Sequence, residues 1–237
     1  YLMTFVHLNN FMFFFIGMRK KIIFPMPAYM IKLANRHKLE MNYFFSIIAW
    51  YVVCVYLFFK AQKKIISKII YFFRFIYKKK FPQNYVYFDC LTDYYAVYTI
   101  KGSKYKNILT WYINWPDSAK NYTYLCHSYK PVSFQELKKN KKSLYIASPI
   151  PPIMSIKNLL KFILWSLCSS FLIILDLLQG KWVNAFVFRE LIEAKIVELD
   201  NGENIAKEYL YNNSRMRPRP GWTYIAENFG SKITFYF

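Results

Sequence analysis

The sequence lacks most of the short motifs that identify a catalytic or metal site. Its four cysteines, Cys54, Cys90, Cys126 and Cys168, lie far apart. They show no C-x-x-C spacing, so the common zinc and redox motifs are excluded. We therefore expect reduced thiols, as in a protein that faces the cytosol. The sequence also contains no P-loop, no G-x-G-x-x-G fingerprint and no recognisable Ser/His/Asp set.

Acidic residues are scarce as well. The chain has 13 Asp and Glu against 33 Lys and Arg, which gives a formal net charge of +20. Such an excess favours an anionic partner, such as lipid headgroups, nucleotide phosphates or nucleic acid. An AT-rich genome is an alternative explanation for the bulk composition, because it would raise Lys, Asn, Ile, Phe and Tyr together. It does not explain arginines that cluster in one loop, because most arginine codons are GC-rich.

Two apolar stretches in the first third of the chain are candidates for membrane contact. Tyr43 to Phe59 contains 17 residues without a charge, which is the lower edge of the length that spans a bilayer. Ile65 to Tyr77 mixes aromatics with Lys68 and Arg74, as does a helix lying in the interface of an anionic membrane. A helix packed on a sheet with lysines pointing outward is an equal alternative. We expect peripheral attachment through residues 43–80, with an integral span as the alternative.

The rest of the chain alternates between strand and helix patterns. Lys21 to Met30 suggests a strand ending at Pro25, and Tyr1 to Met18 suggests a buried strand or helix. From Phe81 on, short aromatic and β-branched stretches predict strands. They are Asn84 to Asp89, Ile108 to Trp115, Tyr122 to His127 and Ser143 to Ala147.

Pro149, Pro151 and Pro152 suggest a stiff crossing and a provisional domain boundary between residues 1–150 and 151–237. Asn158 to Leu178 is apolar but contains Lys161 and Asp176. A charge costs about 3 kcal/mol near a bilayer centre, which favours a buried or interfacial helix over a span. Asn184 to Leu199 predicts a helix whose apolar face is Phe188, Leu191, Ile192, Ile196 and Leu199.

The C-terminal stretch predicts a strand, a loop, a short helix and a second strand. Glu208 to Tyr211 and Ile233 to Phe237 have strand patterns, and Gly221 to Phe229 a helical one that Gly230 ends. Two strands joined by a helix indicate a βαβ unit and a parallel sheet.

The loop after the first of these strands carries Arg215, Arg217 and Arg219, stiffened by Pro218 and Pro220. Loops at the carboxyl ends of strands are where open α/β sheets bind anionic ligands, so the three arginines predict a phosphate cradle. A stiff, solvated connection is the alternative.

The segment Asn212 to Phe237, NNSRMRPRPGWTYIAENFGSKITFYF, resembles a motif in bacterial surface-polysaccharide biosynthesis proteins. These are glycosyltransferase-like proteins of the two-Rossmann (GT-B) type that make O-antigen or capsule. The resemblance is densest from Tyr209 and extends loosely back to Tyr85. It implies an α/β fold with Rossmann-like parallel-sheet units and apolar membrane-associating helices. Because the chain begins with Tyr1 and ends inside a predicted strand, we expect a fragment whose second, nucleotide-binding domain is truncated.

The resemblance also implies an activity. The protein would move a sugar from a nucleotide-sugar donor to a lipid-linked or growing glycan acceptor, as a peripheral protein on the cytoplasmic face of the inner membrane. The sequence has no Asp-x-Asp pair, which argues against a metal-dependent transferase. We expect no cofactor and no metal, because cations and a helix N-terminus can stabilise the departing diphosphate instead.

Candidate site residues follow from these expectations. Arg215, Arg217 and Arg219 would hold the donor phosphates, Asn212 and Asn213 would position the loop, and Trp222 would pack it.

The catalytic candidates are His127 and Glu227. His127 ends a predicted strand, although a lone histidine is more often structural, and Asp89 has the same claim and weakness. The resemblance suggests a Trp-x-x-x-x-Glu placement for Glu227, whose alternative is a surface carboxylate.

Two other classes of protein fit part of the sequence. A basic nucleic-acid-binding protein fits the charge, but no RRM, helix-turn-helix or OB-fold pattern is recognisable, and we expect no nucleic-acid partner. A small integral membrane protein without enzymatic function fits the apolar stretches, but the strand-rich middle argues against it.

Overall fold

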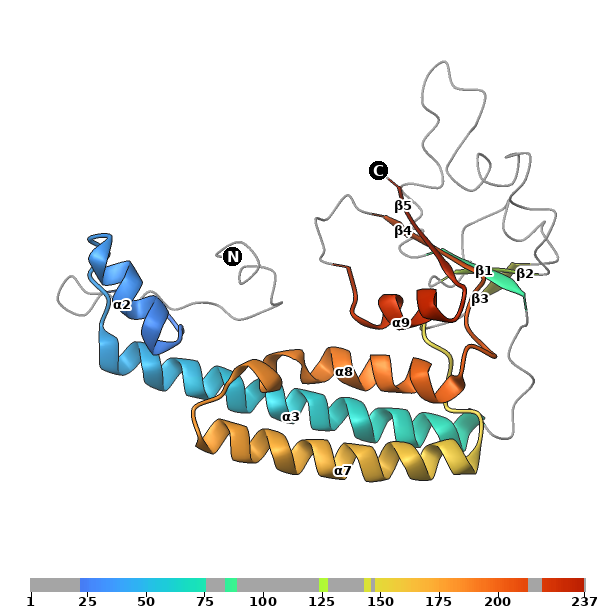
Figure 1. Ribbon diagram of the computed structural model, residues 1–237, viewed down its shortest axis with the longest axis horizontal. Coiled ribbons are helices and arrows are strands. Elements are labelled where there is room, and N and C mark those ends of the chain that lie inside the picture. The colour runs from blue at the N-terminus through green and yellow to red at the C-terminus, as the bar shows by residue number, and fades with distance from the viewer. Residues whose placement is uncertain are drawn as a thin grey trace, which may run out of the picture. The chain divides into compact units, whose positions relative to one another are not determined.

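The computed structural model describes residues 22–75, 84–88, 124–127, 143–145, 148–212 and 219–236 (Figure 1). The chain forms two compact units. The first is Tyr1–Gln62 with Ile173–Phe188, and the second is Lys63–Leu172 with Arg189–Phe237. The predictions for Tyr1 to Met18 and Ile108 to Trp115 lie outside the described residues.

A parallel sheet forms the centre of the second unit. Its five strands are β1 (Tyr85–Phe88), β2 (Tyr124–His127), β3 (Ser143–Tyr145), β4 (Glu208–Asn212) and β5 (Lys232–Tyr236). The order across the sheet is β3-β2-β1-β4-β5, and every neighbouring pair is parallel. The predicted mixture of helices with a parallel sheet is confirmed.

The central strand β1 is covered on both faces. Each of its four residues is at most 1% exposed, as expected for an interior strand of a parallel sheet. Its neighbours come from distant parts of the sequence, because Val86 pairs with Leu125 on one side and with Glu208 on the other. Strands from both sides of Pro149 to Pro152 therefore belong to one sheet, and the two-Rossmann arrangement stays a prediction.

The predicted C-terminal βαβ unit is confirmed. Helix α9 (Trp222–Asn228) connects β4 to β5, and Tyr209 of β4 pairs with Ile233 of β5. The helix ends where Gly230 adopts a positive φ of 87°, a conformation that glycine reaches without a steric penalty. Figure 1 shows α9 beside these two strands.

Two further helices join β3 to β4. They are α7 (Ile156–Leu178) and α8 (Val183–Asp200), and each contributes residues to both units. Phe188, Ile192 and Ile196 of α8 are buried as predicted, but Leu191 is 44% exposed. The prediction that Leu191 belongs to the apolar face is wrong. Successive residues of a helix are rotated by about 100° around its axis, so Leu191 points about 100° away from the neighbouring buried residue Ile192.

The beginning of the first unit differs from the prediction. The strand predicted at Lys21 to Met30 is wrong, because within its described part only Ile22 forms a bridge, to Met41, and α2 (Ala28–Arg36) begins after Pro27. Pro25 and Pro27 have no N–H group to donate to a strand ladder. Proline is well tolerated just before a helix, where N–H groups have no intrahelical partner.

Helix α3 (Tyr43–Phe75) is one helix of 33 residues, whereas the sequence suggested separate stretches ending at Phe59 and beginning at Ile65. The residues between them are Lys, Ala and Gln, which favour helix and do not interrupt it. In the first unit, Trp50 of α3 packs against Trp182 and Phe186, with ring centroids 4.9 and 5.1 Å apart. Phe58 stacks on Phe188 at 6.4 Å.

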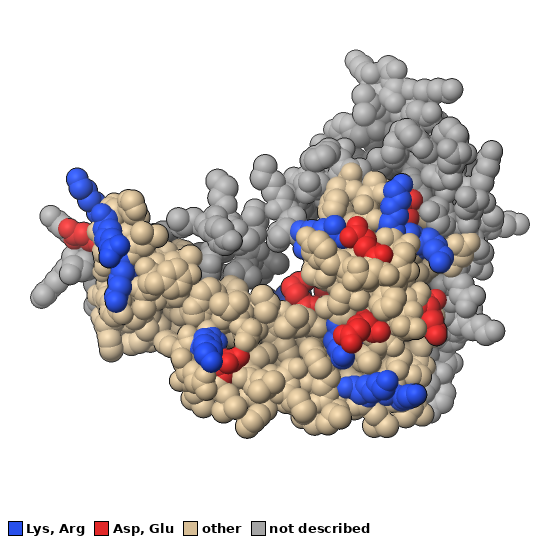
Figure 2. Space-filling model, viewed as in Figure 1, with Lys and Arg blue, Asp and Glu red and all other residues tan. Residues whose placement is uncertain are grey.

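Two helices, α3 and α7, are long and apolar enough to cross a membrane by length and composition, in the part of the chain that the structure describes. A core helix of a soluble protein can pass the same test. In each of these two helices, only 22% of the most apolar 18-residue segment is buried. On the face drawn in Figure 2, the charged side chains of the described residues lie in small separate groups among uncharged ones.

Candidate functional site at the carboxyl edge of the sheet

The order of the strands identifies where a ligand would bind. The chain adds β2 and β3 on one side of β1, then β4 and β5 on the other, so the order reverses between β1 and β4. Doubly wound sheets bind ligands outside the carboxyl ends of the strands at such a reversal. We call the row of last strand residues the carboxyl edge. It consists of Phe88, His127, Tyr145, Asn212 and Tyr236.

His127 is the last residue of β2. It pairs with Phe88 of β1 and with Tyr145 of β3, so only β1 lies between its strand and the reversal. Its catalytic role stays a prediction, and Asp89 lies outside the described residues.

Asn212 is the last residue of β4, where it pairs with Tyr236. It stands two residues beyond Leu210, the partner of Phe88, so β4 extends past the described end of β1. Only β1 lies between β4 and β2, so the strands that carry Asn212 and His127 are about 10 Å apart across the sheet. Three predicted phosphate-binding residues follow Asn212 directly in the chain and lie outside the described residues, namely Asn213, Arg215 and Arg217.

Arg219 contacts three side chains of α9. Its guanidinium forms an ion pair with Glu227, and its Nε donates a hydrogen bond of 2.8 Å to the Thr223 hydroxyl. The guanidinium carbon also lies 4.0 Å from the ring centroid of Tyr224, a cation–π contact. The structure thus brings together Arg219 and Glu227, for which the sequence predicted separate roles. Both roles stay predictions, and the observed contacts fix the chain as it enters α9.

Trp222 is buried directly beneath β4. It is 1% exposed and meets Tyr209 edge-on at 5.0 Å and Tyr211 at 6.3 Å between ring centroids. Tyr209 and Tyr211 are two residues apart and so share one face of the strand. These aromatic contacts anchor α9 to the strand that ends at Asn212.

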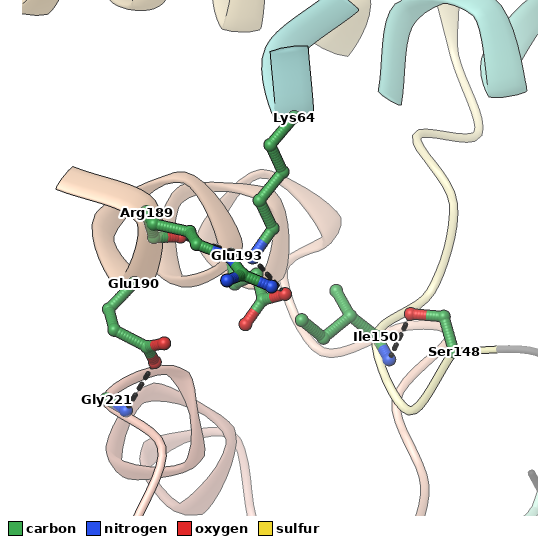
Figure 3. A network of polar contacts seen from close by, with 7 residues as sticks. All are labelled: Lys64, Ser148, Ile150, Arg189, Glu190, Glu193 and Gly221. Atoms are coloured by element: carbon green, nitrogen blue, oxygen red, sulfur yellow. Dashed lines mark hydrogen bonds and ion pairs between the residues drawn. The ribbon is translucent and has the colours of Figure 1, made fainter. Parts of the chain in front are cut away.

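Helix α8 contacts two other elements through carboxylates one turn apart (Figure 3). Glu193 forms an ion pair with Lys64 of α3, whose Nζ also donates a hydrogen bond of 3.3 Å to the carbonyl oxygen of Arg189. Glu190 accepts a hydrogen bond of 3.3 Å from the backbone N–H of Gly221, just before α9. The start of α9 therefore already has a carboxylate from its own chain beside it.

Burial affects the charges of this cluster. It lowers the pKa of Lys64, and the nearby Glu193 carboxylate opposes that change. Burial also lowers the pKa of Lys68, one turn further along α3, where Glu193 again opposes the change and Lys64 adds to it. The Glu193 carboxylate therefore opposes the lowering of the pKa of both lysines.

The cluster of Glu190, Glu193 and Lys64 was not predicted from the sequence. Two glutamates three residues apart on a predicted helix were the available signal, because such residues share a helix face. Their partners could not be inferred, since Lys64 lies on a helix more than a hundred residues earlier.

Other chemistry is limited in the described part of the chain. No group of three His, Cys, Asp or Glu side chains there could hold a metal ion. Cys54 and Cys168 are free, and burial raises the pKa of Cys54 to about 11. A thiol with such a pKa is almost entirely protonated at neutral pH and is therefore a weak nucleophile.

Comparison of the chain with family models, curated proteins and solved structures finds no match. The resemblance of Asn212 to Phe237 to polysaccharide biosynthesis proteins therefore stands on those residues alone.

Proposed function

We propose that the protein transfers a sugar from a nucleotide-sugar donor to a bacterial surface polysaccharide precursor. The observation that carries the proposal is the parallel sheet with the order β3-β2-β1-β4-β5. This is the order of the first five strands in doubly wound nucleotide-binding sheets. The residues that resemble the glycosyltransferase family begin at Asn212, on the strand beside the reversal. The finer assignment to the GT-B class belongs to the same proposal.

The proposed reaction breaks the bond between the anomeric carbon of the sugar and the terminal phosphate oxygen of the donor. A hydroxyl oxygen of the acceptor forms the new bond to that carbon, and its proton passes to a base. His127 is the candidate base because it ends the strand next to β1. The nucleoside diphosphate leaves with the bonding electrons, and its growing negative charge needs preorganised cations.

Arg215 and Arg217 are the proposed cations for the leaving diphosphate. They follow β4 in the sequence, and arginine binds phosphate oxygens with two parallel hydrogen bonds. Arg219 contacts Glu227 and Thr223 of α9. These contacts support a structural role for Arg219, which holds α9 in place, instead of a role in binding the donor phosphates. Glu227 is proposed to contact the ribose or sugar hydroxyls of the donor, since its side chain is 39% exposed beside that ion pair.

Donor binding by the complete protein tests the proposal. Titration calorimetry with UDP-glucose, GDP-mannose and dTDP-glucose would be run on wild type and on Arg217→Ala. Loss of one charged hydrogen-bonding contact should weaken binding of the accepted donor by about 1.5 to 3 kcal/mol, and the loss of transition-state stabilisation should reach about 2 to 4 kcal/mol. Lys207→Ala is the matched control, because it removes one positive charge from an exposed residue at the opposite end of β4.

Three results would contradict the proposal. Equal losses in Arg217→Ala and Lys207→Ala would mean that only overall charge attracts the donor. Equal affinity of wild type and Arg217→Ala would remove the role of Arg217. Tight binding of nucleic acid without binding of any nucleotide sugar would favour the nucleic-acid-binding alternative.

A further inference from the structure

The first unit exposes a row of large apolar side chains along α3. Phe44, Ile48, Val52, Val55 and Phe59 are between 44% and 66% exposed. Their spacing of three or four residues places them on one face of the helix. The row extends over the 16 residues from Phe44 to Phe59, and its two ends are about 22 Å apart along the helix. A continuous apolar surface of this size on a soluble protein marks a site that another apolar surface covers.

The opposite face of the same helix is already occupied. Trp50 and Cys54 are at most 2% exposed, and Trp50 packs against Trp182 and Phe186 near the start of α8. In the described part of the first unit, these contacts lie on the face of α3 that carries Trp50 and Cys54, and the exposed row faces away from them.

Positive charges accompany the row at both of its ends. In the described part of the first unit, five basic residues stand against two acidic ones, Glu40 and Asp176. Asp176 accepts a hydrogen bond of 2.5 Å from the side chain of Asn184. The basic residues are Lys32, Arg36 and Lys38 before α3, Lys60 at the end of the row, and Lys181.

We propose that this row binds the surface of an anionic lipid bilayer, with α3 lying in the plane of the interface. Apolar side chains then enter the acyl boundary while lysines and arginines reach lipid phosphates. Lys60 lies 5.7 Å from the ring centroid of Tyr56, so the cation and the apolar surface adjoin. A second copy of the chain fits less well, because two such units would bring their excess positive charge together.

The in-plane arrangement is favoured by the length of the uncharged part of α3. Only the 17 residues 43–59 precede Lys60, and this is the lower edge of the length that spans a bilayer. A helix lying in the interface needs no such length and leaves its lysines in water. The inference does not rest on sugar transfer.

Vesicle sedimentation of the full chain tests the proposal. Vesicles of phosphatidylcholine and phosphatidylglycerol in equal parts should bind the protein, and vesicles of phosphatidylcholine alone should bind it weakly. High salt should release it. Absence of binding to the anionic vesicles would overturn the proposal, and release by detergent alone would replace it with a transmembrane arrangement.

Matched variants locate the binding surface. Ile48→Glu should weaken binding at least tenfold, whereas Leu191→Glu should not, although both residues are 44% exposed. Lys60→Gln should weaken binding to anionic vesicles about fivefold. Equal effects of Ile48→Glu and Leu191→Glu would overturn the assignment. A lipid-free dimer that Ile48→Glu converts to monomer would show that a second copy covers the row.

A second readout avoids dependence on charged variants that could misfold. Phe59→Trp keeps a large apolar group at a position that is 65% exposed. Vesicles with brominated acyl chains should quench Phe59→Trp more than the wild type, which already contains six tryptophans, and shallow bromines should increase this difference more than deep ones. Unchanged fluorescence in a vesicle-bound protein would exclude contact between this row and lipid.

Discussion

Glu193 is the residue on which the polar cluster of α3 and α8 depends. Its carboxylate pairs with Lys64 and opposes the pKa depression of both Lys64 and Lys68. The paired side chains are only 14% and 21% exposed, so solvent screens the pair less than it screens a surface salt bridge. Removing the Glu193 carboxylate therefore weakens the electrostatic stabilisation of both Lys64 and Lys68, whereas removing Lys64 eliminates a single ion pair.

This asymmetry gives a prediction for stability. Glu193→Gln should lower the free energy of unfolding by about 2 to 3 kcal/mol, because it removes the carboxylate that acts most strongly on Lys64 and Lys68, two partly buried lysines. Lys64→Met should cost only about 1 kcal/mol, because Lys68 still accompanies Glu193. Urea denaturation followed by circular dichroism measures both values, and a larger loss for Lys64→Met would contradict the arrangement.

The same cluster gives the sign of a pH effect. The pKa of Lys64 in the folded protein lies below its ordinary value of 10.5, so between the two values the unfolded chain binds more protons. Lys64 therefore makes the free energy of unfolding rise with pH across that window. Lys63→Met provides the control, since Lys63 is exposed on the same helix. The slope should decrease in Lys64→Met and persist in Lys63→Met.

Individual ion pairs and hydrogen bonds of this kind could not be predicted from the sequence. Arg219 and Glu227 were both singled out as candidates, but their ion pair depends on how the chain turns into α9. Glu190 gave no local signal for its bond to Gly221, because the two residues lie on different elements. The sequence identifies which residues carry charges, whereas the fold determines which of these residues form contacts.

Two glycines end helices of the second unit, and they differ in their surroundings. Gly202 follows α8 with a φ of 77°, and Gly230 follows α9 with a φ of 87°. A Cβ atom at position 202 would lie 2.8 Å from the Cβ of Phe229, whereas one at position 230 would meet nothing within 4 Å. Both positions carry backbone strain for other residues, but only Gly202 also has a close neighbour.

Alanine substitutions should separate these two contributions. Gly230→Ala should lower the free energy of unfolding by about 1 kcal/mol, the cost of a left-handed backbone. Gly202→Ala should cost at least about 2 kcal/mol, because Phe229 must also move. Thermal and urea unfolding of the two variants provide the comparison, and equal losses would show that the contact with Phe229 contributes nothing.

Elements with local signals were predicted well. The unit β4-α9-β5 was recognisable because aromatic strands flank a short helix that ends at Gly230. The continuity of α3 was missed because the lysines after Phe59 resemble the end of an apolar segment, although lysine favours helix. Helix α2 was missed because Pro25 suggested the end of a strand.

The order of the sheet could not be obtained from local patterns. Val86 pairs with Glu208 although more than a hundred residues separate them, and pairings of that range depend on the packing of the whole chain. The carboxyl edge near β1 and β4 became visible only with this order. The sequence supplied the candidates His127 and Asn212, and the topology supplied their common edge.

Charge is the property that acts on the whole molecule. A net charge of +20 on 237 residues repels itself in the compact state. Added salt should screen that repulsion, since the Debye length falls to about 10 Å at 0.1 M ionic strength. The melting temperature should therefore rise by several degrees from low to moderate sodium chloride, and scanning calorimetry measures this rise.

The salt effect also provides the control that the donor experiment needs. Any polyanion should raise the melting temperature of so basic a protein at low salt, whereas a specific donor should still raise it once sodium chloride has screened the charges. Inorganic pyrophosphate is the matched comparison for the nucleotide sugars. A melting temperature that falls with sodium chloride would show that local ion pairs, such as Lys64–Glu193, outweigh the repulsion.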